Sequence, residues 1–195
     1  MNTSVREEKN RIRKELLALR YDISEEEKRS LEIAMAQKFL SLASYRYAET
    51  VLLYFPIKGE PDLTSIIFDE AVKAGKRVAF PLCHTEDCTL TYHLVQSQSD
   101  LIDGTYGTKE PSPDAPLYVP SPDKHDVMLV PGISYDKKGF RLGYGKGYYD
   151  RYLTEFGGTS VGVTFDKLLR KSLPTGRYDR SVDVVLTEKG VSSTK

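Results

Sequence analysis

Residues 126–153 read DVMLVPGISYDKKGFRLGYGKGYYDRYL, and the order of elements in this stretch indicates the fold class. The stretch opens with a short apolar run, Asp126–Val130, which is typical of a buried strand, and a Pro-Gly pair follows it. Three glycines then alternate with Tyr144 and Lys146, and a helix is expected from about residue 147. A buried strand, a glycine-rich loop and a helix in succession indicate an α/β protein.

The glycine loop, residues 141–147, is suited to holding phosphate groups. Alternating glycines allow backbone conformations with positive φ, which gather N–H groups into a concave surface for phosphate oxygens. The amino end of the following helix adds partial positive charge, and Lys146 adds a full charge. Asp150, in the first helical turn, is placed to hold a magnesium ion on the same phosphates. The loop therefore predicts a nucleoside triphosphate site, with a plain tight turn as the alternative.

The spacing of these glycines matches neither of two common nucleotide motifs. It is Gly-x-Gly-x-Gly, and no acidic residue follows about 20 positions later to bind a ribose, as in dinucleotide sites. Lys146 is followed by Gly147 and not by Ser or Thr, so the loop is not a P-loop. The sequence shows no Ser-His-Asp or Cys-His pattern, and we expect ATP itself to supply the activation.

Apolar runs and helical periods alternate along the rest of the chain. Strands are expected at residues 50–55, 77–82, 90–95, 126–130, 160–165 and 182–187, and further helices at 5–20, 24–42 and 62–74. This alternation predicts a mostly parallel sheet with helices on both faces, in a single domain over residues 1–195. Residues 99–125 are expected to be irregular, and the polar tail from Lys189 to be frayed.

The helix expected at residues 5–20 carries a basic row beside an apolar stripe. The stripe consists of Val5, Ile12, Leu16 and Leu19. The basic row consists of Arg6, Lys9, Arg13 and Arg20. Such a row either lays its stems on the core and aims its charges into a cleft, or forms a solvated boundary. Periodicity leaves both interpretations open.

Two carboxylates lie beside expected strands. Ligands of parallel sheets bind beyond the carboxyl ends of the strands, and Glu60, the glycine loop and Asp183 each lie near an expected strand end, which predicts a shared crevice. Glu60 is either an acid at the start of the next helix or an acceptor for a heterocycle. Asp183 stands in an apolar run, where a carboxylate is costly unless it is paired. Asp183 is therefore either a strand-start cap or a metal ligand.

Composition limits the class of protein. Lys plus Arg and Asp plus Glu are both 28 among 195 residues, so the net charge is zero, which argues against a general nucleic-acid binder. The charged start lacks the apolar core of a signal peptide, and no apolar run approaches the roughly 20 residues of a membrane helix. Cys83 and Cys88 lack zinc-site spacing and are expected to be reduced thiols. We expect a cytoplasmic enzyme with no nucleic-acid or membrane partner.

Residues 130–152 resemble the signature of the 5-formyltetrahydrofolate cyclo-ligase family, also called 5,10-methenyltetrahydrofolate synthetase. This stretch is highly specific. Shorter matches, each weak by itself, occur along most of the chain in the same order as in the family. They are Lys9 with Arg13, Tyr54–Pro56 with Gly59–Asp62, Gly107 with Glu110-Pro111, and Val182–Glu188.

The resemblance implies an enzyme that depends on ATP and Mg²⁺. Its substrate would be 5-formyltetrahydrofolate, with or without a polyglutamate tail, and its products 5,10-methenyltetrahydrofolate, ADP and phosphate. Phosphorylation of the formyl oxygen precedes attack by the folate N10, and such transfer needs mainly alignment and charge neutralisation. The implied fold is similar to that of sugar-phosphate isomerases and CoA transferases, and we expect a monomer.

The resemblance also implies roles for individual residues. The expected ATP-binding residues are Lys9, Arg13, Arg141, Gly143, Tyr144, Gly145, Lys146, Gly147, Tyr148 and Tyr149. The expected catalytic residues are Arg141 and Lys146, and the expected magnesium ligands are Asp150 and Asp183. The expected folate contacts are Phe55, Glu60 and Tyr106.

Two other functions compete with this one. A non-catalytic nucleotide-binding regulator would bind ATP and never act on folate. A sugar-phosphate isomerase, suggested by fold analogy alone, would act without ATP and leave the loop from Arg141 to Asp150 unexplained.

Overall fold

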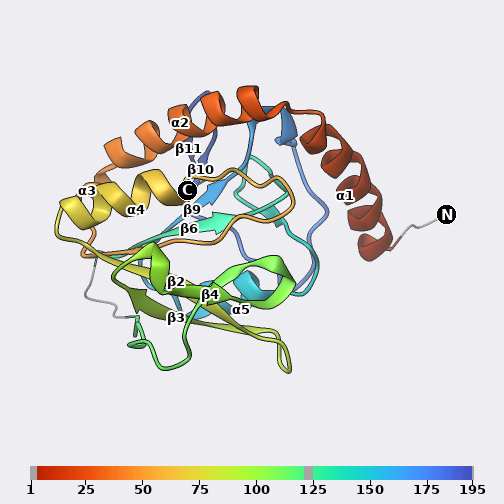
Figure 1. The fold of residues 1–195 in the computed structure, drawn as a ribbon. Coiled ribbons are helices and arrows are strands. Elements are labelled where there is room, and N and C mark those ends of the chain that lie inside the picture. Colours follow the sequence, from red (N-terminus) through yellow and green to blue (C-terminus); the bar gives the residue numbers. More distant parts are fainter. Residues whose placement is uncertain (1–3, 121–124, 195) are drawn as a thin grey trace.

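The computed structural model describes residues 4–120 and 125–194, and its centre is a seven-stranded sheet (Figure 1). In chain order the strands of this sheet are β1 (Thr50–Leu52), β2 (Arg77–His84), β3 (Thr89–Val95), β6 (Val127–Pro131), β9 (Thr159–Val163), β10 (Val184–Leu186) and β11 (Val191–Ser193). Their spatial order is β11-β10-β9-β6-β1-β2-β3. The five inner strands are parallel, and β3 and β11 are antiparallel edge strands. The predicted mostly parallel sheet is confirmed.

Within the described residues, five α-helices and three 3₁₀ turns lie around the sheet. They are α1 (Val5–Tyr21), α2 (Glu25–Ser41), α3 (Ala43–Tyr47), α4 (Thr64–Lys73), α5 (Tyr148–Glu155), η1 (Gln98–Asp100), η2 (Thr105–Gly107) and η3 (Asp166–Leu168). Ser24 caps α2, because its side chain accepts a hydrogen bond from Glu27 N. None of the helices in the described part of the chain combines the length and the apolar character that crossing a bilayer demands.

Side chains of β6 alternate between two apolar cores. Val127 and Leu129 pack on the side of α1, α2 and α4, and Met128 and Val130 pack on the side of α5. Every residue of β6 is buried, as expected of a central parallel strand covered on both faces. In Figure 1, α2 and α4 lie together over one face of the sheet. Helices on both faces are therefore confirmed.

Two segments expected to be irregular form strands. The segment from 99 to 125 contains a hairpin of β4 (Leu101–Asp103) and β5 (Lys109–Pro111), and its residues 121–124 lie outside the described part. The predicted frayed tail is wrong, because β11 pairs with β10. Backbone pairing holds this edge strand, whose side chains are all exposed, so no apolar pattern marked it in the sequence.

The apolar stripe of α1 is narrower than predicted. Ile12 and Leu16 are buried, whereas Val5 and Leu19 are exposed. Arg20, at the end of the same helix, is buried instead. A buried arginine requires partners for its charge and its N–H groups, and those partners lie in the loops beyond β1 and β6.

Candidate active site

The glycine loop lies at the carboxyl end of β6. A small hairpin, β7 (Ser134–Tyr135) with β8 (Arg141–Leu142), precedes it, and α5 follows. Gly145 and Gly147 have φ values of 95° and 80°, which residues with a side chain rarely adopt. Gly147 is the N-cap residue of α5 and offers no side-chain hydrogen bond. The predicted positive-φ turn is confirmed, and the first N–H groups of α5 are left for an anion.

Two basic side chains of α1 have partners far away in the sequence, and one of them, Arg13, reaches the glycine loop. Arg13 Nε donates a hydrogen bond to Gly143 O over 2.7 Å. Lys9 Nζ forms an ion pair with Asp179, and both side chains are largely buried. Arg6 is exposed. Lys9 and Arg13 therefore do not form a purely solvated boundary, and their direction into a ligand cleft stays a prediction.

Arg20 links α1 to two loops, a role that the sequence did not reveal. It is 2% exposed and donates to Gly132 O and, over 3.3 Å, to Tyr144 Oη. Burial raises the pKa of nearby Glu60, and the charge of Arg20 opposes that rise. The sequence placed Arg20 in the basic row of α1. No sequence pattern distinguishes a buried arginine at the end of a helix from an exposed one.

Arg141 and Asp150 form an ion pair across the loop. Arg141 Nη2 lies 3.0 Å from Asp150 Oδ2, and the guanidinium lies 5.2 Å from the ring centroid of Tyr149. Asp150 Oδ1 accepts a hydrogen bond from Arg180 N at 3.1 Å. Arg180 thereby connects the chain before β10 to the start of α5.

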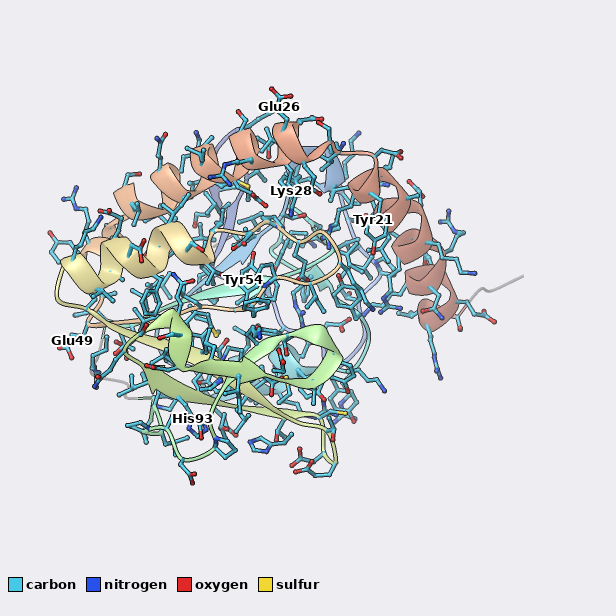
Figure 2. The ribbon with its side chains drawn as sticks, in the orientation of Figure 1. Tyr21, Glu26, Lys28, Glu49, Tyr54 and His93 are labelled. Atoms are coloured by element: carbon cyan, nitrogen blue, oxygen red, sulfur yellow. The ribbon has the colours of Figure 1, made fainter. Side chains whose placement is uncertain are left out.

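Glu60 lies in a fixed loop after β1. Tyr54, in the middle of Figure 2, donates through its hydroxyl to Pro61 O, and its backbone carbonyl accepts from Thr64 Oγ1 at 2.8 Å, so both ends of the loop are held. Half-buried Phe55 is in the same loop, since β1 ends at Leu52 and not at residue 55 as predicted.

The carboxyl group of Glu60 is 3% exposed and accepts one hydrogen bond, from Ile57 N at 3.1 Å. Burial raises its pKa to about 7, although the Ile57 N–H and the charges of Arg20 and Arg141 oppose this shift. The alternative role at the start of a helix belongs to Asp62, whose carboxylate accepts from Thr64 N. The acceptor role toward a ligand is the one that this geometry favours for Glu60.

Tyr106 comes to the glycine loop from a distant part of the sequence. Its hydroxyl lies 3.2 Å from the hydroxyl of Tyr148, the first residue of α5, and the two ring centroids are 6.3 Å apart. The β4–β5 hairpin therefore borders the same site as α1 and the glycine loop. Lys146 is exposed at the tip of the loop.

Residues 5–188 match the 5-formyltetrahydrofolate cyclo-ligase family as a whole. The chain belongs to this family. It resembles the NMR structure of Aquifex aeolicus 5,10-methenyltetrahydrofolate synthetase, with 37% identity and a TM-score of 0.83, over 96% of this chain and 93% of that one. The 5-formyltetrahydrofolate cyclo-ligase of Haemophilus influenzae is 29% identical, over 92% of this chain and 95% of its own. That of Escherichia coli K12 is 28% identical, with 87% and 94% covered.

The site of this cyclo-ligase family member has two features that fit an anionic nucleotide. Among the described residues, Arg20 Nε and Arg141 Nε are buried without a hydrogen-bond partner. Such N–H groups are costly to leave unpaired. Guanidinium groups that keep an unpaired Nε–H beside a positive-φ glycine loop are suited to phosphate oxygens.

The two acidic residues predicted as magnesium ligands lie in different surroundings. Asp150 is in the first turn of α5. Asp183 lies at the amino ends of β9 and β10, where its carboxylate accepts from Ser160 N at 2.9 Å and Ser160 Oγ at 2.7 Å. It therefore does not join Glu60 at the carboxyl edge, as the shared crevice required. Within residues 4–120 and 125–194, no group of three or more His, Cys, Asp or Glu side chains could hold a metal by itself.

Asp150 is nevertheless suited to magnesium bound to a nucleotide. Each of its oxygens accepts one hydrogen bond, and a carboxylate has about four acceptor positions. Mg²⁺ is usually held by one or two carboxylates together with substrate phosphates. The magnesium roles of Asp150 and Asp183 stay predictions.

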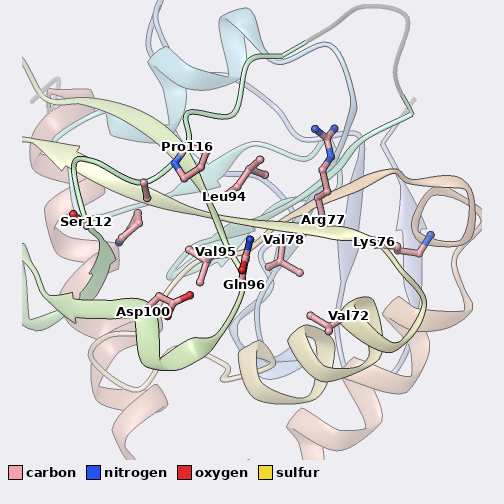
Figure 3. Close-up of a pocket in the computed structure, with 12 residues that line it drawn as sticks. Val72, Lys76, Arg77, Val78, Leu94, Val95, Gln96, Asp100, Ser112 and Pro116 are labelled. Carbon is pink, nitrogen blue, oxygen red and sulfur yellow. The ribbon is translucent and has the colours of Figure 1, made fainter.

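A cavity of about 560 Å³ lies away from this site (Figure 3). It is lined by the end of α4, the start of β2 and the end of β3, including Val72, Val78 and Val95. These ends mark the amino edge of the parallel sheet, opposite the glycine loop. None of the predicted site residues lines it.

Cys83 and Cys88 are free thiols, as predicted, and burial raises the pKa of Cys83 to about 12.

Proposed function

We propose that the chain catalyses ATP-dependent cyclisation of 5-formyltetrahydrofolate to 5,10-methenyltetrahydrofolate, with release of ADP and phosphate. The observation that carries this proposal is the convergence of Arg13 and Arg141 on a positive-φ glycine loop beside buried Glu60, with Lys9 on the same helix as Arg13. Family membership over residues 5–188 supports the choice of substrate.

The reaction needs an activated formyl group. The terminal phosphoryl group of ATP moves to the formyl oxygen, and ADP leaves. N10 then forms a bond to the formyl carbon, the bond from that carbon to the phosphorylated oxygen breaks, phosphate leaves, and N10 loses its proton. The protein's task is alignment and charge neutralisation.

Charges already in place support this task. Lys9 and Arg13 neutralise phosphate oxygens from the side of α1, and the N–H groups of Gly145, Lys146 and Gly147 contact them from the loop. Arg141 is held by Asp150 and stacked near Tyr149, so its orientation is fixed before the nucleotide binds. In this proposal exposed Lys146 turns inward when phosphate is present.

Glu60, Phe55 and Tyr106 form the folate side of the proposed site. Glu60 accepts hydrogen bonds from N–H groups of the pteridine ring, which replaces lost hydration of its carboxylate. Phe55 and Tyr106 supply apolar and aromatic surface for the ring. The folate carries one or several glutamates.

A direct assay tests the proposal. Purified protein with 5-formyltetrahydrofolate, ATP and magnesium should produce the absorbance of the methenyl product, and the rate should fall to zero without ATP. Binding of ATP by calorimetry with no product would favour a nucleotide-binding regulator. Turnover of a sugar phosphate without ATP would favour an isomerase. Either result would reject the cyclo-ligase.

The same assay tests magnesium. Asp150→Asn removes the charge and keeps the side-chain volume, so we expect a higher magnesium concentration for half-maximal rate, together with some loss of stability because the ion pair with Arg141 is weakened. Asp166→Asn, which breaks the ion pair with Lys189 at η3, is the matched control. Normal turnover of Asp150→Asn at limiting magnesium would remove Asp150 from the metal site. Asp183→Asn keeps an oxygen for the two Ser160 bonds and removes the charge, so a raised magnesium requirement with unchanged stability would favour the ligand role.

Location and assembly are also part of the proposal. Two free thiols are typical of a reducing compartment such as the cytoplasm. We propose a monomer, because contacts within one chain, including Lys9 with Asp179, join the parts of the site. Sedimentation at working concentrations measures the assembly state.

A further inference from the structure

The turn of residues 104–108 holds a tyrosine in an unusual conformation. Tyr106 has φ 57° and ψ 18°, and Gly107 follows with φ 78°. A left-handed conformation suits Gly107 but is uncommon for a tyrosine, so surrounding contacts must impose it. Such conformations are maintained where the structure needs a side chain in one particular place.

Glu110 supplies those contacts. It is 4% exposed, and its Oε1 accepts hydrogen bonds from Thr105 N at 3.2 Å, Thr105 Oγ1 at 2.7 Å and Thr108 Oγ1 at 2.9 Å. The turn closes tightly over this carboxylate, because a Cβ on Gly104 would lie 2.4 Å from Glu110 Cδ. Three donors on both sides of Tyr106 thus converge on one buried oxygen.

The turn presents Tyr106 to the glycine loop. The Tyr106 side chain is 54% exposed on one side, and its ring meets that of Tyr148 edge to face, with an interplanar angle of 68°. The two hydroxyl groups lie 3.2 Å apart. Tyr148 is the first residue of α5 and directly follows Gly147. The contact therefore fixes the Tyr106 ring relative to the amino end of α5.

We propose that Glu110 is a positioning residue for the reaction, which acts by holding Tyr106 as one wall of the folate site. Glu110 touches Tyr106's neighbours and not the substrate, so its effect passes through the tyrosine ring. This inference rests on the proposed function. It adds that the Glu110 contacts fix the position of Tyr106 in the folate site before the substrate binds. A preformed wall lowers the ordering cost of binding.

A double-mutant cycle tests this inference. Tyr106→Ala should raise the KM for 5-formyltetrahydrofolate by about tenfold, in the range of measured couplings between contacting residues, and leave the KM for ATP unchanged. Glu110→Ala should give the same selective change. The double variant should lose no more than either single variant, because both remove the same wall. Independent losses that multiply in the double variant would overturn the proposal.

Two further variants separate positioning from folding. Glu110→Gln retains an oxygen at the Oε1 position and its three donors, so its KM for folate should stay within about threefold of the original value. Asp103→Asn removes a carboxylate from the same hairpin, where Asp103 pairs with Lys109 at the surface, and should change nothing. If Glu110→Ala lowers the unfolding temperature and leaves the KM for folate unchanged at about 20 °C, the role is structural and the inference fails.

A physical readout distinguishes this inference from the proposed function. Absence of product from the unmodified protein would contradict the cyclo-ligase function itself. In that case, hydrogen exchange of the Thr105 amide still tests the turn, because this amide donates to Glu110. Exchange should become faster in Glu110→Ala and stay slow in Asp103→Asn. Unchanged exchange in Glu110→Ala would refute the hold of Glu110 on the turn.

Discussion

The carboxyl group of Glu60 couples protonation to folding. Its pKa is raised to about 7 in the folded protein from 4.5, and Arg20, Arg141 and Lys58 are the cations that face it. Between these two values the folded state binds more protons than the unfolded state. The stabilisation associated with the neutral form is therefore complete below pH 4.5 and is lost as the pH rises through 7. The difference between the two pKa values corresponds to about 3 kcal/mol of unfolding free energy.

Glu60→Gln should remove this pH dependence. The amide is neutral at every pH, so the free energy of unfolding of the variant relative to the original protein should rise by about 3 kcal/mol between roughly pH 4.5 and pH 8. Urea denaturation at both pH values measures this difference. Glu26→Gln, on the exposed side of α2 in Figure 2, is the control, because it removes a carboxyl group from the surface instead of from the interior. A pH-independent difference for Glu60→Gln would contradict the raised pKa.

At the scale of elements, the turn between β8 and α5 combines positive-φ backbone with the proposed nucleotide contacts. Gly147 has φ 80°, and Gly75, after α4, has φ 71° with no atom within 4 Å of the place that a methyl group would take. Alanine at either position must adopt a left-handed conformation, which costs about 1–2 kcal/mol. The two glycines thus share the backbone strain and differ in location, and a methyl group at Gly147 must also displace the side-chain atom Arg151 Nη1, which lies 2.8 Å from its place.

Gly147→Ala should therefore lose both stability and ATP affinity. Gly75→Ala should lose about the same 1–2 kcal/mol of unfolding free energy and keep its KM for ATP. Denaturation and initial rates at varied ATP measure the two effects. An unchanged KM for ATP in Gly147→Ala would mean that the loop does not contact the nucleotide.

The sequence revealed the elements that carry apolar runs or glycines. The run of β6 and the glycines before α5 predicted both elements closely, because burial on two faces and positive φ each demand particular residue types. The strands β4, β5 and β11 have mixed or exposed side chains, and backbone pairing alone defines them. No local sequence pattern predicts these strands, because they are defined by pairing with other segments.

At the scale of the whole molecule, β11 completes one edge of the sheet. Ser192 lies opposite Val185 in β10, two positions from the mutually bonded pair Thr187 and Gly190. Since bonded and non-bonded pairs alternate in an antiparallel ladder, Ser192 and Val185 are a hydrogen-bonded pair. Closing the edge in this way protects β10 from pairing with other chains.

Ser192→Pro should open that edge. Proline removes the N–H that bonds Val185 O, and the unpaired carbonyl should lower the free energy of unfolding by about 1–3 kcal/mol. Ser192→Ala keeps the N–H and should be neutral. Denaturation and light scattering measure stability and association. Equal stability of the two variants would mean that β11 contributes nothing to the fold.

The site as a whole was only partly predictable. Periodicity placed Lys9 and Arg13 in one row but left open whether the row faces a cleft, because the partner loop is distant in sequence, with Gly143 130 positions beyond Arg13. Asp183 looked equivalent to Glu60 at a strand end, yet one lies at the amino edge of the sheet and the other at the carboxyl edge. Strand direction, which depends on the complete topology, makes that difference.

The ion pair of Lys9 with Asp179 joins positions 170 residues apart. Ribosomes add about 5–20 residues per second, so α1 emerges roughly 10–30 s before its partner exists. During that interval a nascent chain can form its early helices while the proposed nucleotide site stays unassembled. A polypeptide released before residue 179 would carry α1 without the partner of Lys9, and its proposed site would be incomplete.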